Sequence, residues 1–229
     1  MALNEQYHSP LLFAGIHAFG RFCWFCTMDA QIVGKENLEL PGGYLLACTH
    51  FSHVDPLLLG VLHDRSVDWM TREEFFRFRP LGWLIRKLGG FRVNRFGVPV
   101  SAIRTGLARL EAERLVGIFP EGGVVEVEKS VCRGGAMKQG VCLLSCRSGK
   151  PIIPCVLLGS EKLSRVGPWL PFRRGKIWIA FGEPIYPPEG IASRKYARKL
   201  QAEELQRQFV TLRTLLSQTF EIKPPVQVK

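Results

Sequence analysis

The chain lacks several features that would place it in a specialised class of protein. It has no disulfide framework, because its seven cysteines are an odd number without regular spacing. This cysteine usage favours reduced thiols in a cytosolic setting. We see no internal repeat and no low-complexity segment. What remains is a chain of 229 residues with 46% hydrophobic residues, which suits one domain of ordinary size with a full core.

The N-terminal sequence lacks both a spanning segment and a secretory signal. A spanning helix needs about 20 mostly apolar residues, whereas the apolar run 11–26 is interrupted by His17 and Arg21 on one helical face. The first ten residues contain no lysine or arginine, and Glu5 is acidic, unlike a signal peptide. Residues 1–30 therefore predict an amphipathic helix in the plane of a membrane interface. Packing of its apolar face on the domain and a shallowly inserted hairpin are the alternatives.

Acidic residues are also scarce. The sequence has 31 lysines and arginines against 20 aspartates and glutamates, a net charge of +11, which attracts lipid headgroups or nucleic acid. Aromatic residues are interleaved with these cations: Phe75, Phe76, Phe78, Trp83 and Phe91. This mixture suits a membrane interface and also single-stranded nucleic acid. Because no nucleic-acid motif accompanies it, we expect a membrane lipid surface as a partner and no nucleic acid.

Predicted strands and helices alternate along the chain. The apolar runs predict strands near 32–33 and 67–70 and at 44–49, 91–94, 115–119, 152–158 and 176–181. Helices are predicted at 56–63, 72–88, 99–114, 137–148 and 193–220, the last capped by Ser193. This alternation predicts a single α/β domain at 31–222, with a mixed, mostly parallel sheet flanked by helices, and a tail at 223–229.

The stretch Cys48–Pro56 carries the clearest chemical signal, because His50 and Asp55 stand where a strand gives way to a helix. Five residues along a helix turn about 140°, so the two side chains could not share a helical face. They can meet only if the residues between them form a turn. The carboxylate would then accept from Nδ1–H and leave Nε2 to take a proton. The pair predicts a general base with its orienting acid, for a substrate that brings its own hydroxyl.

The same stretch contains four residue types that bind metals, Cys48, His50, His53 and Asp55. Zinc usually requires a second ligand cluster with short spacing, and the remaining histidines of this sequence are isolated. We therefore expect neither a metal nor a cofactor.

Three further blocks follow: Gly-Gly-Phe-Arg-Val-Asn-Arg at 89–95, Gly-Ile-Phe-Pro-Glu-Gly-Gly at 117–123 and Gly-Lys-Pro-Ile-Ile-Pro at 149–154. Together with the His50 block, in this order and at these intervals, they resemble the glycerophospholipid acyltransferase family. Its best known members are the 1-acylglycerol-3-phosphate acyltransferases. The resemblance spans about residues 34–187, and the combination is far more specific than any one block.

The resemblance implies roles for individual residues. His50 would be the catalytic base, Asp55 its orienting acid, Arg95 a phosphate contact and Glu121 an acceptor-binding residue. From the sequence alone, Glu121 could instead stabilise a helix start. The pair Gly122–Gly123 would allow close approach of the backbone to substrate, or simply form a tight turn.

One block departs from the family pattern. The family commonly has threonine and arginine after Phe-Pro-Glu-Gly, whereas this chain has Gly123 and Val124, so one expected phosphate-binding cation is absent. Lys138 stands in a Lys-Gln-Gly stretch that resembles the Lys-Lys-Gly often found after this block, and is the best matched replacement. Lys129 and Arg133 are alternatives.

These patterns together predict an O-acyltransferase that moves a fatty acyl group from acyl-CoA or acyl-ACP to a lysophospholipid, foremost 1-acyl-glycerol-3-phosphate, in phospholipid biosynthesis. Transfer would be direct, without an acyl-enzyme. The missing arginine leaves open another acceptor, such as a glycolipid, an aminolipid or a pigment glycoside, and an inactive lipid-binding scaffold is a further alternative. We expect a monotopic or peripheral protein on the cytoplasmic face of a membrane. Candidates for an apolar pocket that selects chain length are Trp69, Phe75, Phe76 and Trp83.

Overall fold

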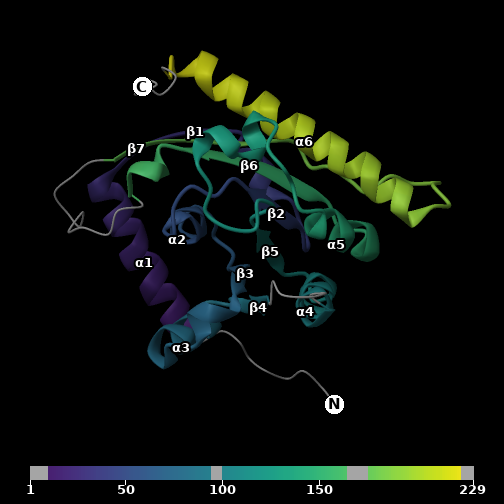
Figure 1. Cartoon of the computed structure of the whole chain (residues 1–229). Coiled ribbons are helices and arrows are strands. Elements are labelled where there is room, and N and C mark those ends of the chain that lie inside the picture. Colours follow the sequence, from purple (N-terminus) through teal and green to yellow (C-terminus); the bar gives the residue numbers. More distant parts are fainter. Residues whose placement is uncertain (1–9, 94–99, 164–174, 223–229) are drawn as a thin grey trace.

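A seven-stranded sheet forms the centre of the protein, which is described here by a computed structural model over residues 10–93, 100–163 and 175–222 (Figure 1). The strands are β1 (Met28–Val33), β2 (Leu45–Cys48), β3 (Val67–Arg72), β4 (Phe91–Val93), β5 (Leu115–Ile118), β6 (Ile152–Leu158) and β7 (Gly175–Phe181). Their order is β1-β7-β6-β2-β5-β3-β4. All neighbours pair in parallel except β6 and β7, which pair antiparallel, so the predicted mixed, mostly parallel sheet is confirmed.

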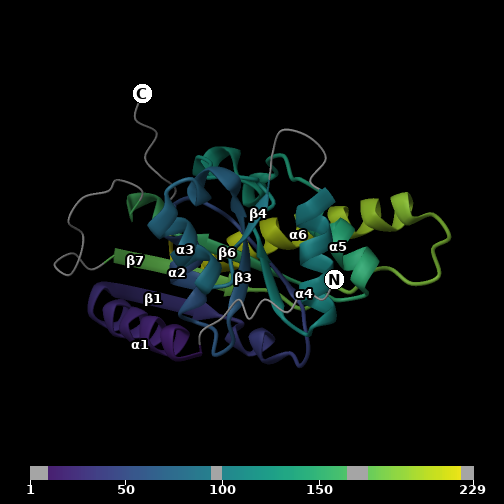
Figure 2. The ribbon, with the colours of Figure 1, turned by 90° about the horizontal axis from the view of Figure 1, so that it is seen from below.

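Six α-helices accompany the sheet in the described residues. They are α1 (Pro10–Thr27), α2 (Asp55–Gly60), α3 (Arg79–Lys87), α4 (Val100–Glu111), α5 (Gly140–Ser148) and α6 (Arg194–Thr219). Short 3-10 helices include η2 (Glu73–Phe76) and η4 (Val131–Arg133). Figure 2 shows α1 beside β1 at one end of the sheet and α4 and α5 toward the other. The predicted cap of α6 is present, since the Ser193 hydroxyl accepts from the Tyr196 N–H at 3.3 Å.

Alternate residues of the central strands enter two different cores. In β2, Leu45 and Ala47 pack with α4, α5 and α6, while Leu46 and Cys48 pack with α2 on the opposite face. Every residue of β2, β5 and β6 is buried, as expected for parallel strands covered on both faces. These three strands therefore present only their ends to a substrate.

A buried ion cluster fixes the position of β3 in the sheet. The Asp68 carboxylate is fully buried and accepts from Arg114 Nε at 2.5 Å, from a terminal nitrogen of Arg114 at 2.6 Å and from Arg109 of α4. Arginine satisfies such a buried carboxylate because its planar fork offers several donors. The next residue, Trp69, packs over Gly117 of β5, where a Cβ atom would lie 2.4 Å from the indole ring.

The predicted helical stretch 72–88 is wrong as a single element. Arg72 is the last residue of β3, η2 follows, and α3 begins only at Arg79 with Pro80 in its first turn, a position that proline favours because its missing N–H would be unpaired there. The boundary predicted at residue 30 falls inside β1. Residues 223–229, predicted as a tail, lie outside the described residues.

Helix α1 contacts the domain through its mixed face. His17 Nε2 donates to the His63 carbonyl at 2.8 Å, Arg21 pairs with Asp64 at 3.1 Å, and Trp24 packs on the core beneath α2. The opposite face exposes large apolar side chains, with exposed fractions from 66% to 87%: Leu11, Phe19, Phe22 and Phe25. The alternative in which the apolar face packs on the domain is thus wrong for these four residues. None of the described helices is long and apolar enough to cross a membrane.

Candidate active site

His50 and Asp55 meet at the carboxyl end of β2, as the sequence predicts. His50 Nδ1 lies 3.0 Å from Asp55 Oδ2, and the same oxygen accepts from the N–H groups of Phe51 and Ser52, each at 2.8 Å. The residues between them form a turn. A carboxylate at this distance favours the tautomer that is protonated on Nδ1, which leaves Nε2 to take a proton. The pair therefore has the geometry of a base and its orienting acid.

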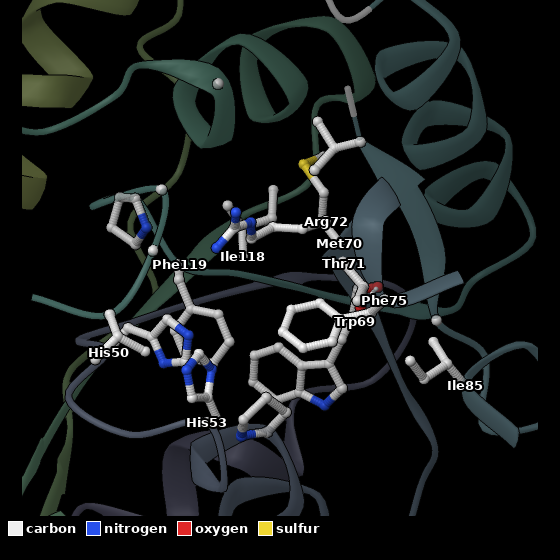
Figure 3. Close-up of a pocket in the computed structure, with 18 of the residues that line it drawn as sticks. His50, His53, Trp69, Met70, Thr71, Arg72, Phe75, Ile85, Ile118 and Phe119 are labelled. Atoms are coloured by element: carbon white, nitrogen blue, oxygen red, sulfur yellow. Dashed lines mark hydrogen bonds between the residues drawn. The ribbon is translucent and has the colours of Figure 1, made fainter. Parts of the chain in front are cut away.

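An aromatic stack holds the imidazole in place. The His50 ring lies 3.9 Å from the Phe119 ring at an interplanar angle of 17°, and Phe119 stacks in turn on Trp69 at 4.8 Å and 10°. His50 and Phe119 follow the carboxyl ends of β2 and β5, and Trp69 lies within β3 (Figure 3). The imidazole plane is thus set by packing as well as by the contact with Asp55.

Glu121 engages the protein through both carboxylate oxygens. Oε2 accepts from the backbone N–H of His50 at 2.7 Å, while Oε1 accepts from the Ser130 hydroxyl at 2.5 Å and from the Val131 N–H at 3.1 Å. Burial raises the pKa of this carboxyl group, and the hydrogen bonds oppose that rise. Glu121 does not line the cavity beside His50. The structure therefore places it behind the base, as a clamp between β2, β5 and η4, whereas its implied role in acceptor binding stays a prediction.

A cavity of about 530 Å³ opens beside His50. Figure 3 shows His50, His53 and Phe119 on one side of it and Phe75 and Ile85 on the other. Its lining is largely apolar and comes mainly from β3, α3, β4, β5 and α5: Trp69, Met70, Leu81, Ile85, Leu88, Val93, Ile118 and Val141. A cavity of this kind suits the hydrocarbon chain of a lipid.

Two of the four aromatic candidates for the apolar pocket are wrong. Trp69 and Phe75 line the cavity, but Phe76 and Trp83 do not. Phe76 is buried against α3, where it lies under the guanidinium groups of Arg86 and Arg92. Trp83 is half exposed on the outer side of α3. Helical spacing alone does not separate the inner face of α3 from its outer face.

Lys138 lines the cavity, and Gly122 makes room for its side chain, whereas the phosphate contact implied for Lys138 stays a prediction. Gly122 has a φ of +77°, and a Cβ atom there would lie 2.5 Å from Lys138 Nζ. Gly123 and Val124 also line the cavity, so the position of the missing arginine faces this space. Lys129 and Arg133, the alternative cations, do not line it. Of the two interpretations of the glycines, the structure shows the tight turn at Gly122, whose N–H donates to the Phe119 carbonyl at 2.9 Å, while close approach of the backbone to substrate stays a prediction.

Arg72 is a cavity residue that the sequence patterns did not single out. It lies at the carboxyl end of β3, lines the cavity, and donates to Glu74 at 3.2 Å. Its buried Nε has no hydrogen-bond partner within the described part of the chain. Its place after a predicted parallel strand, where α/β sheets keep their sites, is the signal that could have found it. Arg95, the implied phosphate contact, lies outside the described residues.

The described residues, 10–93, 100–163 and 175–222, contain no group of three or more His, Cys, Asp or Glu side chains placed to hold a metal ion. Among the described residues, the His50–Asp55 pair lies beside an apolar cavity that has two cations on its wall, Arg72 and Lys138.

Comparison with known proteins assigns this arrangement to a family. Residues 29–158 match the Acyltransferase family, and the chain belongs to it. Over 157 residues it is 28% identical to the 1-acyl-sn-glycerol-3-phosphate acyltransferase of Bacillus subtilis (strain 168). The aligned region covers 68% of this chain and 73% of the relative.

Two further similarities point in the same direction. A chloroplastic 1-acyl-sn-glycerol-3-phosphate acyltransferase of Brassica napus is 24% identical over 180 residues, covering 76% of this chain and 50% of that protein. Among solved structures, the 1-acyl-sn-glycerophosphate (LPA) acyltransferase PlsC of Thermotoga maritima superimposes with a TM-score of 0.66 at 24% identity, over 88% of this chain and 80% of that one. The superposition shows a shared fold.

The hydrogen bonds that Glu121 accepts predict the effect of replacing this residue. In Glu121→Gln an amide NH₂ group replaces one of the two accepting oxygens, so that a donor faces a donor. The backbone of His50 or the η4 turn should therefore shift. We expect turnover to fall by about 10–100-fold with little change in the KM of the acceptor, because a misplaced base slows the reaction without removing a substrate contact. Steady-state kinetics on the folded variant test this.

Glu128→Gln is the matched control, since Glu128 is exposed in the same segment and should leave the kinetics unchanged. A Glu121→Gln enzyme with normal turnover and a raised KM for the acceptor alone would instead support the acceptor-binding role.

Proposed function

We propose that the protein transfers a fatty acyl group from a thioester to the free hydroxyl of 1-acyl-glycerol-3-phosphate, a step of phospholipid biosynthesis. The observation that carries the proposal is the His50–Asp55 pair on the wall of an apolar cavity, within a chain of the Acyltransferase family. The relatives from Bacillus subtilis and Brassica napus are named for this reaction, which supports the choice of acceptor.

The proposed chemistry is general-base catalysis. His50 Nε2 takes the proton of the acceptor hydroxyl as its oxygen attacks the thioester carbonyl, and Asp55 stabilises the imidazolium that forms. The tetrahedral intermediate then collapses, the C–S bond breaks, and the imidazolium returns the proton to the departing thiolate. The backbone at Gly122–Gly123 borders the same space and is our candidate for stabilising the oxyanion. The donor, acyl-CoA or acyl-ACP, is a co-substrate, and the mechanism needs no cofactor.

We assign the two cations of the cavity wall to the binding of the acceptor's phosphate. A phosphate monoester needs fixed positive charge, and a guanidinium can meet two phosphate oxygens at once. Arg72 and Lys138 supply such charge where Val124 replaces the usual arginine. The same replacement favours a second candidate function, in which the acceptor is a lipid without an accessible phosphate monoester, such as a glycolipid or an aminolipid.

We further propose that the enzyme works as a monotopic or peripheral protein at the cytoplasmic face of a membrane. The exposed face of α1 would lie in the boundary between headgroups and acyl chains, where each large apolar side chain contributes roughly 1.5–3 kcal/mol when fully buried. Phe78 and Trp83 are also exposed beside the arginines of α3, and such a mixture suits the interface. The net charge of +11 adds attraction to anionic lipid.

The reaction is tested with purified protein, a labelled acyl thioester and a panel of lyso-acceptors. We expect turnover of lysophosphatidate, and a loss of about 10²–10⁴-fold in His50→Ala, because a general base typically contributes that much. His53→Ala is the control, since His53 is a second histidine of the same cavity and, within the described residues, the hydrogen bonds to Asp55 come from His50, Phe51 and Ser52. Near-normal turnover by a folded His50→Ala variant would rule out this mechanism, and turnover of another acceptor alone would select the second candidate.

Recognition of phosphate predicts a selective effect of Arg72. In Arg72→Gln the apparent KM for lysophosphatidate should rise by about tenfold or more, as expected for the loss of a charge-assisted contact, while the KM for the acyl thioester stays near that of the wild type. Arg77→Gln, an exposed arginine of the same region outside the cavity, is the control. Equal increases for both substrates would remove the phosphate assignment.

Membrane attachment is tested on α1 itself. The triple variant Phe19→Ser, Phe22→Ser, Phe25→Ser removes exposed side chains that stabilise no core. The melting temperature should therefore not change. Binding to anionic vesicles, measured by sedimentation, should weaken by at least tenfold. High salt should weaken binding of the wild type in part, because charge provides one share of the attraction. Unchanged vesicle binding by the triple variant would show that other surfaces hold the enzyme.

A further inference from the structure

A second cavity, of about 260 Å³, lies between the first turns of α5 and α6. Its lining is Gln139, Ser193, Lys195, Tyr196, Arg198 and Lys199. The segment 138–140 takes part in both cavities, because Lys138 and Gly140 line the first and Gln139 lines the second. Figure 1 shows α5 beside the start of α6. The proposed mechanism uses none of these six residues.

The charges around this cavity are unfavourable without a bound anion. Arg194, Lys195, Arg198 and Lys199 fall in the first turns of a 26-residue helix that has no acidic residue in its first turn. The N-terminus of a helix carries partial positive charge and disfavours cations. Lys199 has an exposed ion pair with Glu203 at 3.7 Å, which contributes little, and no ion pair joins Arg194, Lys195 or Arg198 to another described residue.

Arg198 and Tyr196 indicate which kind of anion fits. Arg198 lines the cavity, and its buried Nε has no hydrogen-bond partner among the described residues. Guanidinium and ammonium groups are the usual partners of phosphate. Tyr196 adds a half-exposed aromatic ring among these cations, and a purine base can stack on such a ring. Cations around an aromatic ring in a concave site match a phosphorylated nucleotide.

We propose that this second cavity binds the phosphorylated nucleotide end of a coenzyme A thioester, and therefore that the acyl donor is acyl-CoA. The inference rests on the proposed function, which requires a thioester donor. The phosphates lie among Lys195, Arg198 and Lys199, and the adenine stacks on Tyr196. The pantetheine arm then passes the first turn of α5 and delivers the thioester to His50. An acidic carrier protein or an anionic lipid surface would also be attracted by these cations, but neither requires a concave site lined by an aromatic side chain.

Calorimetric titration of the full chain with coenzyme A tests the proposal without turnover. Lys195→Ala, Arg198→Gln and Tyr196→Ala should each weaken binding by about tenfold, since each loses one contact. Arg207→Ala is the matched control, because Arg207 belongs to the same helix, lies outside the cavity and pairs with Glu204. In assays with acyl-CoA, the first three variants should raise the KM of the donor and leave that of the acceptor unchanged.

Wild-type affinity for coenzyme A in all three variants would overturn the proposal. So would a loss that appears only with an acyl carrier protein or with anionic vesicles, since the cations would then serve a different partner. Intact coenzyme A binding that depends on these residues, in a protein without acyltransferase turnover, would support this site and contradict the proposed function instead.

Discussion

The buried carboxylate of Asp55 is the contact on which the candidate active site depends. One of its oxygens closes the turn after β2 by accepting from two backbone N–H groups, and the same oxygen orients His50. Because the carboxylate is fully buried, the cost of removing its charge from water is offset only while these donors stay in place. The same carboxylate oxygen therefore sets both the shape of the turn and the tautomer of the base.

Contacts with neighbouring strands and loops hold this turn in place. Thr49 exchanges hydrogen bonds with the backbone of Leu157 in β6, Glu121 accepts from the backbone of His50, and Phe119 stacks on the imidazole. Leu157 lies near the carboxyl end of β6, and Phe119 and Glu121 lie in the loop after β5. A parallel sheet brings such ends to one edge, which is why α/β folds keep their sites there.

The positive charge of the chain is divided among sites of different character. Arg109 and Arg114 neutralise a buried aspartate and hold β3 in place, so they are structural. Arg72 and Lys138 border the apolar cavity, where charge can orient a polar headgroup while the chain of a lipid lies among aliphatic and aromatic residues. The cations at the start of α6 border a separate cavity. Net charge alone could not distinguish these three uses.

The sequence by itself determined most of what is local: the strands of the sheet, most of the helices, the cap at Ser193, and the turn that joins His50 to Asp55, since partners a few residues apart leave a readable pattern. It did not show that the stretch 72–88 divides between β3, η2 and α3. The tertiary structure decided what joins distant residues. Glu121 accepts from the backbone of His50 across 71 positions, Arg72 and Lys138 line the same cavity, and β7 runs antiparallel to β6. It also decided which face of α1 meets the domain, because helical periodicity defines a face but not its partner. Contacts between segments far apart depend on how the sheet is ordered, and no local pattern encodes that order.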